Sequence, residues 1–486
     1  AVSANVQPDT KMHHQELTVS TAKIETDYLI VGSGAVGMAF ADTLVHESQA
    51  TMVIVDRHHA PGGHWCDAYP FVRLHQPSAY YGVNSRPLGT NAKDATGINQ
   101  GMCERASSAE LLAYYEAVMQ TLLASGRAQY FPMSDYVGEE DGVHRFKSLT
   151  SGVVRQVVAR KKWVDTTYLQ TAVPSTHPPK YSVAPGLQCV PLNALPQIKQ
   201  AHSGYVVVGS GKTGIDACLW LLENDVPPSA ITWIMPRDAW YINRATVQPG
   251  IEFFLQSYGS FATQLECVAQ ATSVDDLLQR LHAGGQLLRL SDEVQPSMYH
   301  SAIMSQSELK LLRTITNVVR MGRVLRIEAD QIVLERGTVP TDSRRLYVDC
   351  SASAVQRRPL LPVFDGKKIT PQFVRTVQPT FSAALIAHVE THYEDEAEKN
   401  KICTVIPLPD VPIDWLRMLT VNMGNQYRWN KDKNLRAWVE QSRLDGFTAL
   451  AHSVTEEDTE KVAVMERFGQ SAGAALANAQ KLLAQA

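Results

Sequence analysis

The stretch Asp27-Tyr-Leu-Ile-Val-Gly-Ser-Gly-Ala-Val-Gly37 places three glycines directly after a short apolar run and before a helical segment at 35–44. A second apolar run, 53–55, ends at Asp56. Runs this apolar predict strands that are buried on both faces of a parallel sheet. In such a strand–turn–helix unit the first glycine allows the tight turn, the second lets backbone approach a pyrophosphate, and the third lets helix and strand pack closely. We therefore expect a dinucleotide-binding unit here, the alternative being an ordinary glycine turn of an α/β protein.

The residues around this turn suit two parts of a dinucleotide. The phosphates would face free N–H groups at the start of the helix. Asp56 ends the second strand, where a carboxylate can accept hydrogen bonds from both ribose hydroxyls of an adenosine. Strand, helix, second strand and terminal acid thus agree with one interpretation.

The same pattern recurs later in the chain. Tyr205-Val-Val-Val208 leads into Gly209-Ser-Gly-Lys-Thr-Gly214 and a helix that runs through Leu222. The strand after it, 231–235, is followed by Arg237 instead of an acid. An arginine at this position indicates a 2′-phosphate and hence NADP(H) rather than NAD(H), with a surface ion pair as the alternative role.

Two neighbours of Arg237 bear on this interpretation. Trp240 could stack on the guanidinium or on adenine. Asp238 would disfavour a phosphate, unless it is a turn residue that points to solvent. Arg244 follows in the same segment, Pro236-Arg-Asp-Ala-Trp-Tyr-Ile-Asn-Arg244.

The composition narrows the class of protein. The chain has 486 residues, of which 44% are hydrophobic and 19% charged, with a net charge of −4. These values indicate a globular protein and predict no nucleic-acid or membrane partner. Seven cysteines without a CxxC pair indicate free thiols in a reducing cytoplasm and exclude an enzyme that passes electrons through a close cysteine pair. Two dinucleotide sites without such a pair suggest electron flow from NADPH to a flavin.

A family resemblance appears beyond the first motif. Gly62-Gly-His-Trp65, with Arg73 and Tyr80-Tyr81 after it, resembles the GGxW segment of flavin-containing and Baeyer–Villiger monooxygenases. The segment 236–244 resembles the NADPH 2′-phosphate segment of flavin-containing monooxygenases. The resemblance covers 27–90 and 205–245 strongly and 345–400 weakly.

The resemblance implies FAD and NADPH as cofactors and a small organic substrate with a nucleophilic N or S atom, or a ketone. NADPH would reduce FAD, and O₂ would add to flavin C4a to give a peroxyflavin that oxygenates the substrate. The FAD-binding residues that the motifs and the resemblance indicate are Gly32, Ser33, Gly34, Ala35, Val36, Gly37, Asp56, Arg57, Gly63, His64, Trp65, His75, Val137, Thr380 and Ser382. The NADPH-binding residues are Gly209, Ser210, Gly211, Lys212, Thr213, Gly214, Arg237, Trp240 and Arg244.

The reaction itself carries over less well than the cofactors. The family's FxGxxxH fingerprint is missing, because 184–191 contains no histidine, and its late ATG-like segment reads Val348-Asp-Cys-Ser-Ala-Ser-Ala354. The acid that follows the arginine in Baeyer–Villiger enzymes corresponds to His75. The flavin-near asparagine has only Asn84 or Arg86 as counterparts. The candidate catalytic residues are His75, Tyr81, Asn84 and Arg86.

Each candidate outside the glycine motifs also has a structural alternative. His75 could relay protons or be a histidine bonded to backbone, and the tyrosines could line the site or pack as a corner. The helix that starts near Pro379 could stabilise reduced flavin with its N-terminus, or Thr380 and Ser382 could cap it without a ligand. Val137 could be a plain strand residue. His13-His14 and His58-His59 fit solvated surface, so no metal site is expected.

We therefore predict an α/β fold with two Rossmann-like three-layer dinucleotide-binding domains, the FAD domain being interrupted by the NADPH domain, and an antiparallel meander at 143–170. The expected domains are a loose tail 1–26, the first FAD part 27–200, the NADPH domain 201–345 and the second FAD part with C-terminal helices 346–486. The expected function is NADPH-dependent, FAD-containing monooxygenation. A flavin dehydrogenase, reductase or oxidase without oxygen insertion and a non-catalytic binding subunit are the alternatives, and the sequence is compatible with a homo-oligomer.

Overall fold

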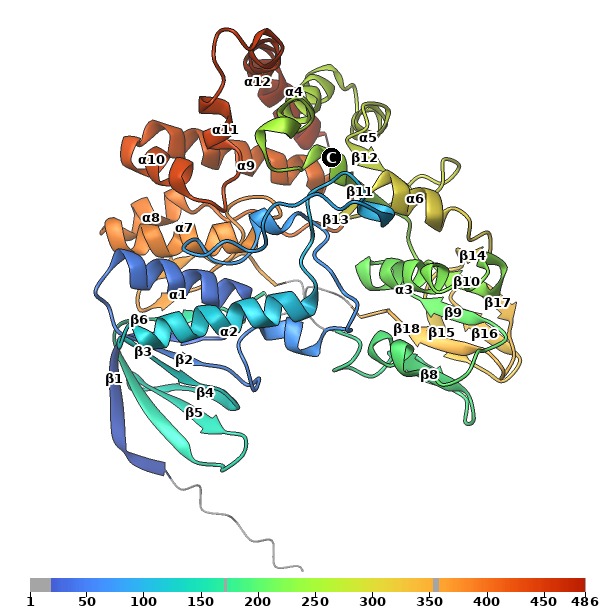
Figure 1. The fold of residues 1–486 in the computed structure, drawn as a ribbon, viewed down its shortest axis with the longest axis horizontal. Helices are drawn as coiled ribbons and strands as arrows, with labels where there is room; N and C mark the ends of the chain where they lie inside the picture. Colours follow the sequence, from blue (N-terminus) through green and yellow to red (C-terminus); the bar gives the residue numbers. More distant parts are fainter. Residues whose placement is uncertain (1–18, 170–172, 353–357, 486) are drawn as a thin grey trace, which may run out of the picture.

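Two parallel sheets, each centred on one glycine motif, form the framework of the computed structural model (Figure 1). The structure describes residues 19–169, 173–352 and 358–485. The predictions about residues 1–18, His13-His14 among them, and about residues 353 and 354 lie outside the described residues. The predicted α/β class with two dinucleotide-type units is confirmed.

The first sheet has the strand order β19-β20-β6-β1-β2-β3. Its central strands β1 (Val19–Val31), β2 (Met52–Val55) and β3 (Ala128–Phe131) are parallel, and β6 (Val154–Asp165) runs parallel to β1 on the other side. Strand β1 begins well before Asp27, so the predicted loose tail to residue 26 is wrong over 19–26.

Both faces of this sheet are covered, which explains its continuous apolar strands. Ile30 and Ile54 point into the cluster formed with α1 (Ala35–Glu47) and α2 (Ser108–Ala124). Leu29 and Val53 point to the other face, where Phe146 of the antiparallel meander covers them. The meander comprises β4 (Ser134–Glu140), β5 (Val143–Ser148) and β6, so it begins earlier than predicted.

The second sheet has the strand order β14-β10-β9-β18-β8. Strand β9 (Tyr205–Val208) lies between β10 (Ile231–Ile234) and β18 (Leu346–Asp349), and β18 also pairs with β8 (Gln188–Pro191). Helix α3 (Lys212–Glu223) follows the glycine turn. The predicted boundaries at 200/201 and 345/346 are therefore wrong, because strands on both sides of the segment 201–345 belong to this sheet.

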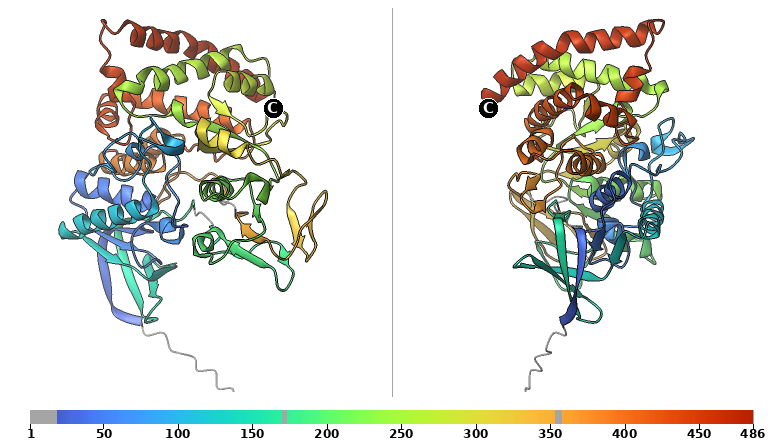
Figure 2. Two further views of the ribbon diagram at one scale, coloured as in Figure 1. Left: turned by 45° about the vertical axis from the view of Figure 1, so that its right-hand side comes forward. Right: turned by 90° about the vertical axis from the view of Figure 1, so that its left-hand side faces the viewer.

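A helical layer covers one end of both units (Figures 1 and 2). It contains α4 (Phe254–Gln270), α5 (Val274–Ala283), α9 (Asp414–Lys431), α10 (Lys433–Gln441) and α12 (Thr459–Ala484), and α12 packs along α4. The segment 251–315 also holds two strands, β12 (Leu287–Leu288) and β13 (Met298–Met304). Within the described part of the chain, no helix has the length and apolar character to cross a membrane.

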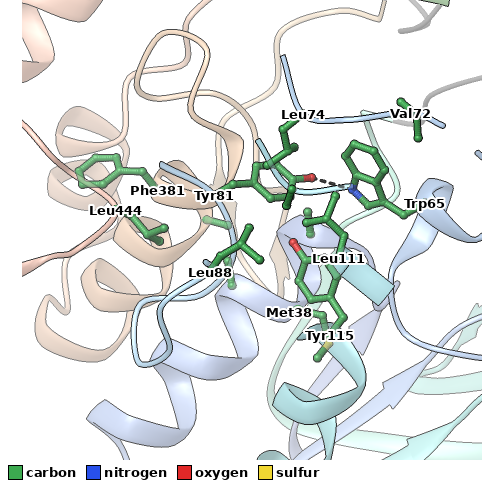
Figure 3. Packing of buried hydrophobic residues seen from close by; sticks show 14 of the residues in the cluster. Met38, Trp65, Val72, Leu74, Tyr81, Leu88, Leu111, Tyr115, Phe381 and Leu444 are labelled. Atoms are coloured by element: carbon green, nitrogen blue, oxygen red, sulfur yellow. Dashed lines mark hydrogen bonds between the residues drawn. The ribbon is translucent and has the colours of Figure 1, made fainter. Parts of the chain in front are cut away.

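Helix α7 (Pro379–His392) returns from the second unit to the first and packs beside α1. Its side chains are buried from Thr380 to Glu390, so it behaves as a core helix and not as an amphipathic surface helix. A close view of the adjoining core shows Phe381 of α7 and Leu444 on one side, and Trp65 on the other (Figure 3).

Candidate functional site

The first glycine turn is held closed by contacts that only glycine allows. Gly32 has a φ of 105°, in the left-handed region that favours glycine. A Cβ atom at Gly37 would lie 2.0 Å from the carbonyl oxygen of Gly32. Helix α1 thus approaches β1 as closely as backbone permits, which is the third glycine's expected role.

Asp56 fixes this turn from the end of β2. One of its carboxylate oxygens accepts hydrogen bonds from the backbone N–H of Ser33 at 2.5 Å and from its hydroxyl at 2.9 Å. The other lies 2.8 Å from both the backbone nitrogen and Nδ1 of His58, whose Nε2 contacts Asp67 at 2.8 Å.

These contacts set the charges at the turn. Burial alone raises the pKa of Asp56, but the hydrogen bonds from His58 and Ser33 outweigh it and hold the pKa below its usual value. The hydrogen bond with Asp56 outweighs burial at His58 and, with Asp67, raises the pKa of its imidazole to about 9. An ionised aspartate and a protonated histidine therefore face each other at neutral pH.

The Gly-Gly-His-Trp loop closes directly onto the first turn. The N–H of Gly62 donates to the carbonyl of Ser33 at 2.9 Å, and a Cβ atom at Gly63 would lie 2.8 Å from Cα of Gly34. Beyond this contact, Trp65 Nε1 donates to the hydroxyl of Tyr81 at 3.0 Å (Figure 3). The structure thus brings together four of the predicted residues, Gly34, Gly63, Trp65 and Tyr81.

Burial keeps the nearby titratable groups neutral. It raises the pKa of the Tyr81 hydroxyl to about 12 and lowers the pKa of the His64 imidazole to about 4. Trp65 is itself buried and lies beside the ring of His64. This part of the site is an apolar wall without a free charge on these three residues.

The second glycine turn repeats the geometry of the first. Gly209 has a φ of 125°, and a Cβ atom at Gly214 would lie 2.1 Å from the Gly209 carbonyl oxygen. That oxygen accepts a hydrogen bond from Trp233 Nε1 at 2.8 Å. A Cβ atom at Gly211 would meet no described atom within 4 Å, so this turn has open space at its middle glycine.

The helices that follow the two turns begin at a glycine and without a capping side chain, and among the described helices α4, α7 and α9 also lack such a cap. Helices α2, α5 and α10 each start with a Ser or Asp side chain that accepts from backbone N–H groups. Helices α1 and α3 start at Gly34 and Gly211, and no side chain in the described structure caps them. Their first N–H groups are therefore left for an external acceptor, as an anionic phosphate would provide.

Tyr69 connects the two units at the second turn. Its hydroxyl donates to Asp216 of α3 at 2.5 Å, and Lys212 forms an ion pair with the same carboxylate. Neither Tyr69 nor Asp216 was predicted as a site residue. Their only sequence signal is position, since Tyr69 closely follows the GGxW segment and Asp216 lies one turn after Lys212.

Arg237 lies beside the second turn, in an ion pair. Its guanidinium contacts Asp410 at 2.8 Å, its side chain is 36% exposed, and His300 Nε2 lies 3.0 Å from the same Asp410 oxygen. Ser210 donates from its hydroxyl to the Arg237 carbonyl at 2.9 Å, which ties the arginine to the turn. Asp238 does not point to solvent: it is buried and pairs with Arg320 at 2.8 Å.

The predicted roles of Trp240 and Arg244 in the NADPH site are wrong, because both side chains are buried. Strand β11 (Ala239–Asn243) carries Trp240 into the core, where it is 0% exposed and lies under Arg289 and not Arg237. Arg244 is 1% exposed and bound to Glu308 at 2.8 Å. Both predicted roles require access to a ligand that these side chains do not have.

His75 is a buried histidine bonded to backbone, which was the alternative to a proton relay. Its Nδ1 accepts the N–H of Ile303 at 3.2 Å, and its carbonyl accepts from Arg244 Nε at 2.9 Å. Burial, together with the charges of Lys212 and Arg244, lowers the pKa of the imidazole to about 3. A neutral ring bonded to backbone does not relay protons at physiological pH.

The remaining predicted residues are placed as follows. Asn84 accepts from Ser442 at 2.8 Å, and Arg86 is exposed. Arg57 pairs with Asp135 on the surface, and Val137 is exposed. The N-cap of α7 is Gln378, so neither Thr380 nor Ser382 caps the helix. Both side chains are buried. The Thr380 hydroxyl donates to the carbonyl of Tyr80, and the Ser382 hydroxyl accepts hydrogen bonds from the N–H groups of Val374 and Arg375. Ala35 and Val36 are the first two residues of α1, and Thr213 is the second residue of α3.

Comparison with known proteins places the chain beside mycobacterial relatives. No family model matches the chain. The uncharacterized protein Rv2000 of Mycobacterium tuberculosis (strain ATCC 25618 / H37Rv) is 51% identical over 461 residues, which cover 95% of this chain and 85% of that protein. The uncharacterized protein Mb2023 of Mycobacterium bovis gives the same values. The chain belongs to the family of these mycobacterial proteins.

Solved structures that resemble this chain at the level of the backbone include a cyclohexanone monooxygenase and a flavin-containing monooxygenase. Cyclohexanone monooxygenase from Rhodococcus sp. Phi1 bound to NADP⁺ shares 13% identity with the chain, covering 79% of this chain and 89% of that one, with a TM-score of 0.48. A flavin-containing monooxygenase from Stenotrophomonas maltophilia shares 14%, covering 83% and 99%, with a TM-score of 0.42. At such scores the overall arrangements differ, so these structures assign no role to any residue of this chain.

Proposed function

We propose that the protein is an NADPH-dependent, FAD-containing monooxygenase that oxygenates a small organic molecule in the cytoplasm. The observation that carries this proposal is the duplication of one geometry. Two parallel sheets each contain a turn in which a glycine Cβ would collide with a backbone carbonyl, and each turn opens a helix whose start no side chain caps in the described structure. Such a turn is built for a dinucleotide phosphate.

The first unit is the proposed FAD site. The N–H groups at 35–37 would donate hydrogen bonds to the pyrophosphate, and the Asp56 carboxylate would accept hydrogen bonds from the adenosine ribose. The four lone-pair positions of a carboxylate are already used at Asp56 by Ser33 and His58. Ribose binding therefore requires at least one of these donors, such as the Ser33 hydroxyl, to turn away from Asp56.

The second unit is the proposed NADPH site. Lys212 lies in the first turn of α3, where its charge adds to that of the helix N-terminus toward a phosphate. Arg237 would bind the 2′-phosphate in place of Asp410, exchanging one bidentate anionic partner for another. The seven free cysteines support a reducing compartment.

The wall of Trp65, His64 and Tyr81 suits the reacting end of the first site. When bound, FAD accepts hydride from NADPH and passes electrons to O₂, and this is the chemistry that an added oxygen atom needs. The chain's own residues would contribute in two ways. The Tyr81 hydroxyl holds the Trp65 ring in place, and the uncharged His64 and Tyr81 side chains would keep charge and water away from the flavin.

A second function is favoured by one observation, the placement of His75. The histidine at the position of the Baeyer–Villiger acid is neutral and bonded to backbone, so it offers no charge to the flavin edge. A flavin dehydrogenase, reductase or oxidase without oxygen insertion needs no such charge.

Aerobic turnover with NADPH distinguishes these functions. A panel of small amines, thioethers and ketones is incubated with the enzyme, and products are analysed by mass spectrometry. Monooxygenation predicts a product one oxygen atom heavier, with ¹⁸O incorporated from ¹⁸O₂. NADPH consumption with hydrogen peroxide as the only product, across the panel, would support the second function instead.

A further inference from the structure

Helices α1 and α7 come together at their C-terminal ends. Helices α1 and α7 pack side by side (Figures 1 and 2). Glu47 is the last residue of α1, and His388 and His392 lie one turn apart at the end of α7. None of these three residues belongs to either glycine turn.

The three side chains converge on one point. His388 Nδ1 lies 2.7 Å from one carboxylate oxygen of Glu47, and His392 Nδ1 lies 3.6 Å from that same oxygen. One ligand atom from each residue lies within 4.8 Å of those from the others. Ligands of one tetrahedral ion are separated by about 3.4 Å when each bond is about 2.1 Å. The two distances from the Glu47 oxygen, 2.7 and 3.6 Å, lie on either side of this spacing.

The surroundings support the carboxylate and one imidazole as ligands. Trp438 Nε1 donates to the second oxygen of Glu47 at 2.5 Å, and its ring stacks on that of His388 at 4.6 Å. Such outer partners orient metal ligands and fix their charge state.

His392 lies against His388 as well as near Glu47, with its ring stacked on that of His388 at 4.2 Å. His392 Nδ1 also lies 2.9 Å from the His388 carbonyl, and 2.8 Å from the Thr391 hydroxyl, so the ring has local partners that it would exchange for an ion. A divalent cation would bind both rings and the carboxylate at once, and it would lie at the negative ends of two helix dipoles.

We propose that Glu47, His388 and His392 bind a divalent first-row transition metal ion, with Zn²⁺ as the best-suited species. Two imidazoles and one carboxylate are ligands that Zn²⁺ accepts, and His392, with 46% of its side chain exposed, leaves a fourth position for water. The ion would clamp the last turns of α1 and α7. Its role is structural and does not depend on the proposed redox function.

Metal titration of the purified full-length protein tests the site. The protein is stripped with a chelator and titrated with Zn²⁺ by calorimetry, and with Co²⁺ by visible absorption as a probe of coordination. We expect one equivalent to bind, and we expect Zn²⁺ to raise the melting temperature. His392→Ala and Glu47→Gln should each weaken binding at least tenfold and abolish the thermal shift.

Two further variants separate ligands from surroundings. Trp438→Phe keeps the ligands and removes the hydrogen bond to Glu47, so affinity should fall by about 10- to 100-fold. His46→Ala is the matched control, since His46 precedes Glu47 on the same helix and bonds instead to the backbone of Asp42. Circular dichroism checks folding. The proposal is overturned if no stoichiometric binding occurs, or if His392→Ala and Glu47→Gln, still folded, bind as the unaltered protein does.

Discussion

The hydroxyl of Tyr69 donates a hydrogen bond to Asp216 across 2.5 Å, and this contact joins the loop beside the first glycine turn to the helix that opens at the second. Because Asp216 also pairs with Lys212, the loop and the proposed NADPH phosphate site share one anionic residue. The relative placement of the two proposed cofactors therefore depends on this bond.

Replacing Tyr69 with phenylalanine tests that dependence. A hydrogen bond to a charged group contributes about 1.5–3 kcal/mol, so Tyr69→Phe should lower the free energy of unfolding by an amount in that range. We expect a higher KM for NADPH with unchanged flavin content, measured by steady-state kinetics and absorbance. An unchanged melting temperature together with an unchanged KM would show that the bond connects nothing of consequence.

The two glycines that contact carbonyls should separate the cofactors. Gly37→Ala places a methyl group 2.0 Å from the Gly32 oxygen and should abolish flavin binding. Gly214→Ala makes the equivalent clash at 2.1 Å in the second unit and should leave flavin bound but stop its reduction by NADPH.

The control for this pair is Gly473→Ala in α12, where a Cβ would meet no described atom within 4 Å. Alanine replaces glycine there at a gain of up to about 1 kcal/mol in stability. Loss of flavin from both Gly37→Ala and Gly214→Ala with equal loss of fold would contradict a division into two separate sites.

The Asp410 carboxylate competes with the proposed 2′-phosphate for Arg237. Asp410→Asn removes the charge that holds the arginine and should lower the KM for NADPH several-fold, while Arg237→Ala should raise it by about 10-fold or more, the effect of one lost charged contact. The KM for NADH should change little in both variants. Equal effects on NADPH and NADH would place Arg237 away from the 2′-phosphate.

His58 makes the stability of the first unit depend on pH. Its pKa rises from 6.5 to about 9 on folding, so the folded state binds more protons than the unfolded state between these values. The contribution of His58 to the free energy of unfolding is complete below about pH 6.5 and is lost as the pH rises through about 9. It amounts to at most about 3 kcal/mol.

The lowered pKa of Asp56 acts in the opposite range, because its stabilisation is present above about pH 4 and lost on further acidification. Melting temperatures of the unaltered protein and of His58→Gln should therefore diverge below pH 7 and converge by pH 10. Parallel curves across this range would contradict an ion pair between His58 and Asp56.

Local sequence patterns predicted the two glycine turns. The residues that were predicted wrongly are placed by contacts with residues far away in the sequence. The spacing of Gly32, Gly34 and Gly37 determines a turn whose geometry involves only its own neighbours. Arg244, by contrast, was predicted to face a ligand, but Glu308, far along the chain, draws it into the core.

Local sequence patterns also could not predict the order of the strands in the second sheet, or which distant side chains lie close together. The pairing of β18 with β9 and β8, which assigns this strand to the second unit, has no signal in its own residues. Glu47 lies 341 positions from His388, so only the packing of α1 on α7 brings them together. The i, i+4 spacing of His388 and His392 was the one signal that could have indicated this cluster.

The central claim is that one chain holds a hydride acceptor and a hydride donor in two adjacent glycine-turn sites. Anaerobic titration of the purified protein with NADPH, followed by absorbance of the bound flavin, tests it most directly. We predict one flavin per chain, lost on denaturation, whose oxidised absorption disappears on addition of one equivalent of NADPH. A protein that binds no flavin on reconstitution with FAD, or whose bound flavin stays oxidised under excess NADPH, would contradict the account.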